Sequence, residues 1–314
     1  AYRAPGTGQW VYEEPAPMQA AGMSVALALD ADDQVYLAYF ASRNDSAILH
    51  YTWRTVGDTG TWQPYQRVAQ RNWGIYGFDQ DFGFLRPSID LHLRGQQDPR
   101  IVFFDHTSIP CDGATSPDDF GLEMWEATTA PLGGWQVRSF GDLPPYDISF
   151  NQCEAVAGLR YGEYCKVVVD AAGQEHVFTR TLQSARVLDF RRNPDPTGER
   201  WLRAAIDSID NYVSNPSLFL IAATAFDYIS AYPTPDTLVH LAYRYEFSRA
   251  LTYAQLQPDG SIQYQPVDAG GAKGGTYITA RDTDSLYISA FDQENNLINL
   301  YTSYDRGVNW NRSA

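Results

Sequence analysis

A pattern of four short strands recurs five times along this chain, and this recurrence restricts the possible folds more than any single motif does. The first occurrence, residues 24–68, contains the runs SVALALD, QVYLAYF, AILHYTW and TWQPYQRV. These runs alternate apolar with polar residues or are rich in β-branched and aromatic residues, and turn residues separate them. The pattern predicts an antiparallel meander of four strands.

The expected units lie at residues 24–68, 87–140, 164–206, 216–267 and 276–313. Repeats of this length with four strands each are typical of propeller blades rather than of a sandwich. We therefore expect an all-β fold in which residues 1–314 form a single β-propeller domain, with five blades preferred and six as the alternative. The segment GQWVYEEPAP at residues 8–17 resembles the fourth strand of the later units and is a candidate for the strand that closes the ring.

The composition fits such a fold and excludes several functions. Hydrophobic residues make up 44% of the chain and aromatic residues 14%, which is enough for a packed sheet core. The net charge of −15 disfavours nucleic acids and anionic membranes as partners. No run reaches the roughly 18 apolar residues of a membrane-spanning helix. The small residue Ala1 at the start is what a secreted protein shows after cleavage, so we expect a secreted, periplasmic or cell-surface protein.

The three cysteines, Cys111, Cys153 and Cys165, show neither CxxC spacing nor a neighbouring histidine, which disfavours zinc. One disulfide with one spare thiol suits an exported protein, and Cys153–Cys165 and Cys111–Cys153 are the preferred pairs. Three buried free thiols are the alternative.

One motif resembles a known family. The stretch SYDRGVNW places Ser303, Asp305, Gly307 and Trp310 in the pattern S-x-D-x-G-x-x-W. This pattern, with the repeat, resembles the secreted bacterial proteins of the sialidase-like (BNR or Asp-box) propeller superfamily. The resemblance implies that the box is a structural turn between third and fourth strands: Asp305 would bind turn amides, Gly307 would supply a positive φ, and Trp310 would pack between blades. Only one such box is present, so the match bears on the fold more than on activity.

The candidate site lies where the second strands end and the long loops begin. The expected ends are Phe40, Asp105, Arg180, Arg244 and Asp292. Two guanidinium groups and two carboxylates that converge there would bind an anionic or hydroxylated ligand, and Arg86 on the same side would add a third arginine. Their alternative role is to form salt bridges with one another at the mouth of the channel.

Three residues are candidates for acid–base catalysis: His106, Asp105 and Asp292. His106 directly follows Asp105 and lies outside the strand patterns, in an expected loop. The other histidines, His50, His92, His176 and His240, lie within strand patterns, so we expect them to pack inside the blades. Trp73, Tyr76 and Phe78, in the first long loop, are candidate platforms for sugar rings.

Asp79 and Asp81 are carboxylates in the same loop and candidate ligands for Ca²⁺, although the chain has no EF-hand pattern. Solvated loop acids are the alternative interpretation.

These observations support three functions. The preferred one is a secreted propeller that binds a glycan or another polar ligand at the long-loop face. The alternative is a glycoside hydrolase or lyase that acts on a polysaccharide, and the second alternative is a scaffold for protein partners. The sequence contains no phosphate-binding loop and no G-x-S-x-G elbow, and it therefore does not decide whether the protein is an enzyme.

Overall fold

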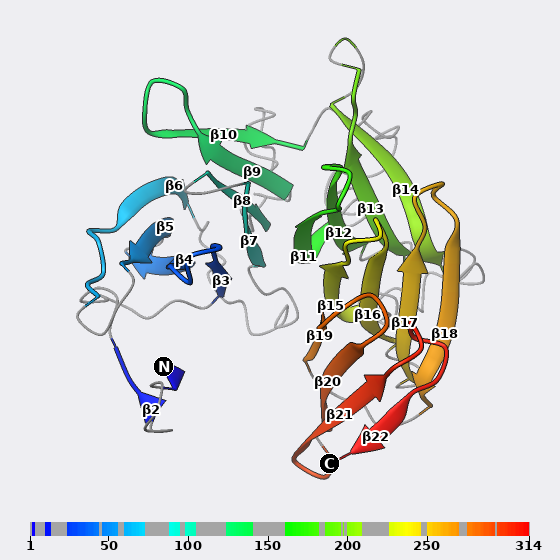
Figure 1. The fold of residues 1–314 in the computed structure, drawn as a ribbon. Coiled ribbons are helices and arrows are strands. Elements are labelled where there is room, and N and C mark those ends of the chain that lie inside the picture. Colours follow the sequence, from blue (N-terminus) through cyan, green and yellow to red (C-terminus); the bar gives the residue numbers. More distant parts are fainter. Residues whose placement is uncertain are drawn as a thin grey trace, which may run out of the picture.

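The computed structural model describes residues 2–3, 10–13, 24–43, 46–55, 60–72, 88–94, 98–104, 124–140, 161–181, 186–195, 197, 200–208, 226–245, 250–269, 275–292 and 294–313. Among these residues, five antiparallel sheets of four strands each surround a common centre (Figure 1). This all-β arrangement confirms the propeller and its five blades. The described residues include no helix that is long and apolar enough to cross a membrane.

Each blade is a meander whose strands pair in chain order. Blade 1 consists of β3 (Val25–Leu29), β4 (Val35–Arg43), β5 (Ser46–Arg54) and β6 (Gln66–Asn72). Blade 2 consists of β7 (Ile89–Leu93), β8 (Pro99–Phe104), β9 (Met124–Thr129) and β10 (Trp135–Ser139). Blade 3 consists of β11 (Tyr161–Val169), β12 (Glu175–Thr181), β13 (Arg186–Arg192) and β14 (Trp201–Ser208). Blade 4 consists of β15 (Phe226–Pro233), β16 (Val239–Tyr245), β17 (Ala250–Leu256) and β18 (Ile262–Asp268). Blade 5 consists of β19 (Thr276–Ala280), β20 (Leu286–Asp292), β21 (Leu297–Ser303) and β22 (Asn311–Ser313).

Two expected boundaries differ from the structure. Blade 4 begins with β15 rather than with residues 216–222, which lie outside the described residues. The N-terminal segment does not supply the last strand of blade 5, because β22 takes that place. Instead, β2 (Trp10–Val11) pairs with β1 (Tyr2–Arg3), and the Glu13 carboxylate accepts hydrogen bonds from Arg54 at 2.8 Å and from Trp62 at 3.0 Å in blade 1.

The first strands form the innermost layer, and successive ones contact each other from β3 to β19. Side chains bind the neighbouring backbone across these contacts. The Val167 amide donates to Asp90 at 2.8 Å, and the Ile278 amide donates to Ser230 Oγ at 3.1 Å. Four apolar clusters fill the spaces between adjacent blades, so alternate side chains along a strand serve two different interfaces.

Two faces result from this connectivity. We call the face with the turns between first and second strands the hairpin face. The opposite face, where the second strands end and each blade connects to the next, is the loop face.

The turn with the S-x-D-x-G-x-x-W pattern joins β21 to β22 on the hairpin face. Asp305 accepts the Asn309 amide at 2.9 Å, and Gly307 has a φ of 88°. The Trp310 ring lies 5.3 Å from Tyr253 of blade 4, edge to face. The turn thus has the three structural features that the motif implied. The motif's assignment to a sialidase-like family stays a prediction.

Cys165 is a buried free thiol in the middle of β11, not a loop residue. Its Sγ lies 3.3 Å from Ser88 Oγ and 3.7 Å from the Val102 carbonyl. The expected Cys153–Cys165 disulfide is therefore not formed in this structure, because β11 holds the sulfur between blades. Cys111 and Cys153 lie outside the described residues.

Candidate active site

The register of the hairpins between first and second strands aligns the five blades. The first paired residue of each second strand is Val35, Pro99, Glu175, Val239 or Leu286. The position five residues later in each blade is Phe40, Phe104, Arg180, Arg244 or Phe291. Asp292 comes one residue after this position and, because strand side chains alternate, belongs to the other side of its blade. Phe40, Arg180 and Arg244 thus occupy equivalent register positions, whereas Asp292 is one residue further along; Asp105 lies outside the described residues.

Blades 3 and 4 each have a bulge in the first strand, near the residues that pair with Arg180 and Arg244. The sequence analysis did not predict these bulges. In blade 3 the pairing shifts between Glu163 and Lys166, and in blade 4 it shifts between Asp227 and Ser230. Each bulge contains a tyrosine with a left-handed backbone, Tyr164 at a φ of 53° and Tyr228 at 56°. Bulky residues rarely adopt positive φ, and bulges and backbone strain both concentrate near functional sites. The same local distortion in two neighbouring blades therefore marks a candidate site.

The two tyrosines and the two arginines form a row. The guanidinium of Arg180 lies 4.9 Å from the Tyr164 ring centre, and that of Arg244 lies 5.3 Å from the Tyr228 ring centre. The two tyrosine rings are themselves 5.1 Å apart. Both arginines are more than nine-tenths buried, so cation–π contact with the rings helps to hold the charge inside the protein.

Each arginine also has an acidic residue opposite it on the first strand. Glu163 pairs in register with Arg180, and Asp227 pairs in register with Arg244. The spacing is the same in both blades, since 180 − 163 and 244 − 227 both equal 17. This repeated acid–Tyr…Arg spacing is the sequence signal that would have located the site. It was missed because the expected first strand of blade 4 was placed ten residues too early.

Two other tyrosines form hydrogen bonds between blades. Tyr243, next to Arg244, donates a hydrogen bond to Asp207 of blade 3 at 2.7 Å. Tyr301 of blade 5 donates to Asp268 of blade 4 at 2.5 Å. Burial, and then the interaction with Asp207, raises the pKa of Tyr243 well above its usual value, so this hydroxyl stays protonated. These bonds join blade 4 to blades 3 and 5.

Asp292 has a different environment from the two arginines. Its carboxylate accepts the amides of Glu294 at 3.0 Å and Asn295 at 3.2 Å, and the Asn295 side chain at 2.7 Å. A carboxylate held this way stabilises its own turn. Its proposed catalytic role remains a prediction.

Most of the residues proposed from the sequence lie outside the described residues. These are His106, Asp105, Arg86, Trp73, Tyr76, Phe78, Asp79 and Asp81. The described parts of the chain hold no cluster of three or more His, Cys, Asp or Glu side chains suited to a metal ion. The proposed calcium ligands Asp79 and Asp81 thus remain a prediction. Of the strand histidines, His176 and His240 are buried, as expected.

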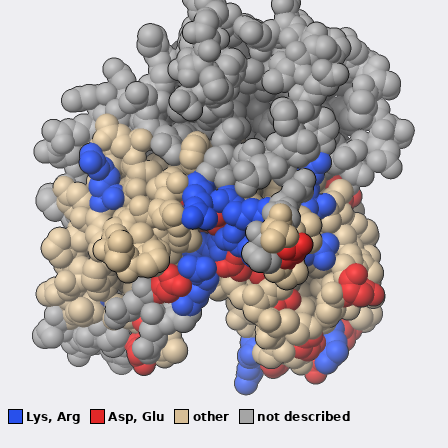
Figure 2. Space-filling model, turned by 90° about the horizontal axis from the view of Figure 1, so that it is seen from above, with Lys and Arg blue, Asp and Glu red and all other residues tan. Residues whose placement is uncertain are grey.

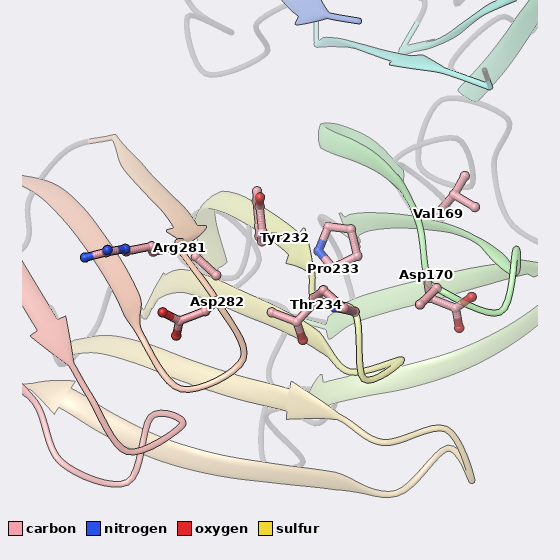
Figure 3. A pocket seen from close by; sticks show the side chains of 10 residues that line it. Val169, Asp170, Tyr232, Pro233, Thr234, Arg281 and Asp282 are labelled. Carbon is pink, nitrogen blue, oxygen red and sulfur yellow. The ribbon is translucent and has the colours of Figure 1, made fainter. Parts of the chain in front are cut away.

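The hairpin face has a cavity among the turns of three blades. This cavity of about 310 Å³ is lined by turn and strand-end residues of blades 3, 4 and 5 (Figure 3). Asp170 and Asp282 face it, but both carboxylates accept amides of their own turns at 2.7 to 3.0 Å. Hydrogen bonds from Ser285 and its amide lower the pKa of Asp282, which keeps this group ionised. The cavity is therefore poorly suited to general acid catalysis.

Comparison with known proteins agrees with the fold. A protein of unknown function from Dyadobacter fermentans is similar over 92% of this chain and 80% of its own, with 12% identity and a TM-score of 0.57. An α-L-arabinanase from Penicillium chrysogenum is similar over 91% of this chain and 77% of its own, with 12% identity and a TM-score of 0.52. An ulvan lyase, a polysaccharide lyase, is similar over 92% of this chain and 65% of its own, with 11% identity and a TM-score of 0.52. No family model matches the sequence, and no curated protein matches it.

Proposed function

We propose that this protein is a polysaccharide-degrading enzyme, specifically a glycoside hydrolase, with its active site on the loop face at blades 3 and 4. The proposal depends on one observation, which we call the acid–Tyr…Arg set. It consists of an acidic residue, a tyrosine and an arginine at equivalent register positions of two blades: Glu163, Tyr164 and Arg180 in blade 3, and Asp227, Tyr228 and Arg244 in blade 4. The arabinanase and the ulvan lyase, which share the fold, support a carbohydrate substrate. We therefore prefer the hypothesis that the protein is an enzyme to the glycan-binding function that the sequence favoured.

Glycoside hydrolysis uses two carboxyl groups on either side of the scissile bond. One protonates the leaving oxygen, and the other attacks the anomeric carbon or activates a water molecule. Glu163 and Asp227 are the acidic residues at equivalent positions of neighbouring inner strands, so we assign these two roles to them. Arg180 and Arg244 would supply positive charge beside the substrate, and their stacking on the tyrosine rings would fix their positions.

An elimination reaction is the second candidate, and the Arg–Tyr stacks favour it. A guanidinium next to a uronate carboxylate neutralises it and makes the adjacent C–H more acidic, while a tyrosine can take or return the proton. The chain's net charge of −15 does not prevent binding of an acidic polymer, because charges beyond about 8 Å are largely screened at physiological salt.

A product assay tests both candidates. Neutral and uronate-containing polysaccharides are incubated with the protein, and reducing ends and unsaturated sugars are measured separately. New reducing ends without unsaturation support hydrolysis, and unsaturated products support elimination. The absence of both with every polymer would contradict an enzyme and favour a binding function.

A further inference from the structure

A second cavity lies far from the arginines, between blades 4 and 5 toward the hairpin face. Its volume is about 510 Å³, within the range of small-molecule sites. One wall comes from β17 and β18, and the other from residues 305–308 of the turn between β21 and β22. Figure 1 shows β17 and β18 on the same side of the ring as β21 and β22.

Four glutamines dominate the first wall, Gln255 and Gln257 from the β17 side and Gln263 and Gln265 from β18. Gln255 and Gln263 are direct cross-strand partners, and Gln265 is the partner of Tyr253. Because strand side chains alternate, the glutamines at i and i+2 share one side of the sheet. The result is a staggered row of amides centred on the Gln255–Gln263 pair, and Gln265 at one end of it reaches the turn.

Hydrogen bonds orient part of this patch. Gln257 donates to the Gln255 carbonyl at 3.1 Å, and Gln265 donates to the Val308 carbonyl at 2.8 Å. Gln255 is only 7% exposed, whereas Gln263 is exposed. The patch thus combines a fixed, desolvated amide at its base with an accessible one at its rim.

The two charged side chains that line this cavity already have partners within the protein. Asp305 accepts the Asn309 amide at 2.9 Å and the Asn309 side chain at 2.6 Å. Arg306 forms an ion pair with Asp284 at 2.7 Å. Leu238 and the exposed Val308 add apolar surface beside the amides.

We propose that this amide groove, formed by Gln255, Gln257, Gln263 and Gln265 with the turn at 305–308, is a second glycan site that binds a neutral oligosaccharide. An amide presents one acceptor and two donors, which match the alternating donor and acceptor character of adjacent sugar hydroxyls. The apolar C–H face of a sugar would pack on Val308. A neutral ligand fits because Arg306 is paired with Asp284 and the Asp305 carboxylate already accepts the hydrogen bonds from Asn309.

Binding measurements test this site without reference to turnover. Pentasaccharides of glucose, xylose, mannose and arabinose are titrated into the wild-type protein by calorimetry and by saturation-transfer NMR. We expect at least one to bind with an affinity that is unchanged between 50 and 500 mM NaCl, on the order expected for an uncharged ligand. Binding by none of them would overturn the proposal.

Variants then locate the site. Gln255→Leu with Gln263→Leu should raise the Kd at least about tenfold, because two amide hydrogen-bonding groups are lost. Gln263→Leu alone, at an exposed position, covers the case in which the double variant does not fold. The matched control Gln136→Leu, an exposed glutamine on β10, should leave binding unchanged.

Arg180→Ala separates this proposal from the proposed function. Unchanged binding in that variant supports an independent site. If Arg180→Ala abolishes binding and the glutamine variants do not, the oligosaccharide occupies the loop face and the amide groove is not a glycan site. Loss of turnover in Arg180→Ala concerns the proposed function alone.

Discussion

The rings of Tyr164 and Tyr228 lie 5.1 Å apart, each on a bulge with positive φ and each beneath an arginine of the next strand. These residues come from neighbouring blades and are 64 positions apart, since 228 − 164 = 64. The repeat therefore brings two copies of one local distortion into contact at a single place in the ring.

A buried ion network between blades 2 and 3 is expected to dominate stability. Arg100 is fully buried and binds both Glu126 and Glu175, and Arg192 and Arg200 bind Glu126 at 3.0 and 3.1 Å. Figure 2 shows basic and acidic side chains side by side near the middle of one face of the molecule. Glu126→Gln should lower the free energy of unfolding by about 3–5 kcal/mol, because the change leaves the buried Arg100, together with Arg192, to share the single carboxylate of Glu175 and removes the Glu126 partner of Arg200.

Denaturant unfolding measures this change. Asp284→Asn is the control, since it breaks the exposed pair with Arg306 and should move the midpoint little. If Glu126→Gln and Asp284→Asn lowered the free energy of unfolding by the same amount, burial would not strengthen the ion pairs of this network.

Alanine substitutions at two glycines distinguish the cost of backbone strain from the cost of a steric clash. Gly307 and Gly173 have similar φ values, 88° and 83°. A Cβ at Gly307 would lie 2.5 Å from the Tyr253 ring, whereas a Cβ at Gly173 would have no atom within 4 Å. Gly173→Ala should cost about 1–2 kcal/mol of stability, from the left-handed backbone alone. Gly307→Ala should cost clearly more, and equal losses in thermal unfolding would contradict the close packing on Tyr253.

His240 makes stability dependent on acid pH. It is fully buried between Thr234, at 2.9 Å, and Tyr253, at 2.7 Å. Burial lowers its pKa from 6.5 to about 4, so the unfolded state binds the proton more readily than the folded state does. The stability that the neutral, buried His240 contributes is therefore fully present above pH 6.5 and is lost as the pH falls toward 4.

The size of the effect follows from the shift of the pKa. At 1.36 kcal/mol per unit, the loss from this residue is about 3 kcal/mol. His240→Gln should reduce the slope of the unfolding free energy between pH 6.5 and 4. An unchanged slope in that variant would mean that other groups account for the acid sensitivity.

Cys165 should be inert in the folded protein. Burial raises its pKa to about 12, so almost no reactive thiolate exists near neutral pH. In a Cys111→Ser, Cys153→Ser variant, a thiol reagent should label this residue only when denaturant is added. Rapid labelling of the native protein would contradict its position between Ser88 and Val102.

The repeat in the sequence was sufficient to predict the architecture. Period-two alternation identified the strands, and the recurrence identified the five blades, because both depend on local pattern alone. The fourth strand of blade 5 was ambiguous, since both GQWVYEEPAP and VNWNRS carry a tryptophan and alternate. Only sheet pairing, which depends on distant contacts, assigned β22 to this place.

Three of the residues proposed from the sequence lie in the described part of the chain, namely Arg180, Arg244 and Asp292. Arg180 and Arg244 were identified from their positions at the ends of second strands, and the register confirms that these positions are equivalent. Asp292 was placed with them, but it is one residue later and binds its own turn. Tyr164 and Tyr228 were missed because the first strand of blade 4 was expected ten residues too early, so the repeated spacing of acid, tyrosine and arginine was not compared between blades; the bulge and the positive φ themselves result from strand pairing.

The acidic residues of the repeated set provide the most direct test of the account. Turnover of the best polysaccharide substrate is measured for Glu163→Gln, for Asp227→Asn and for Asp195→Asn, a control in an exposed turn of blade 3. We predict that each of the first two variants binds substrate but loses about 10²–10⁴-fold in kcat, and that the control keeps wild-type activity. Wild-type kcat in both Glu163→Gln and Asp227→Asn would contradict an active site at the acid–Tyr…Arg set.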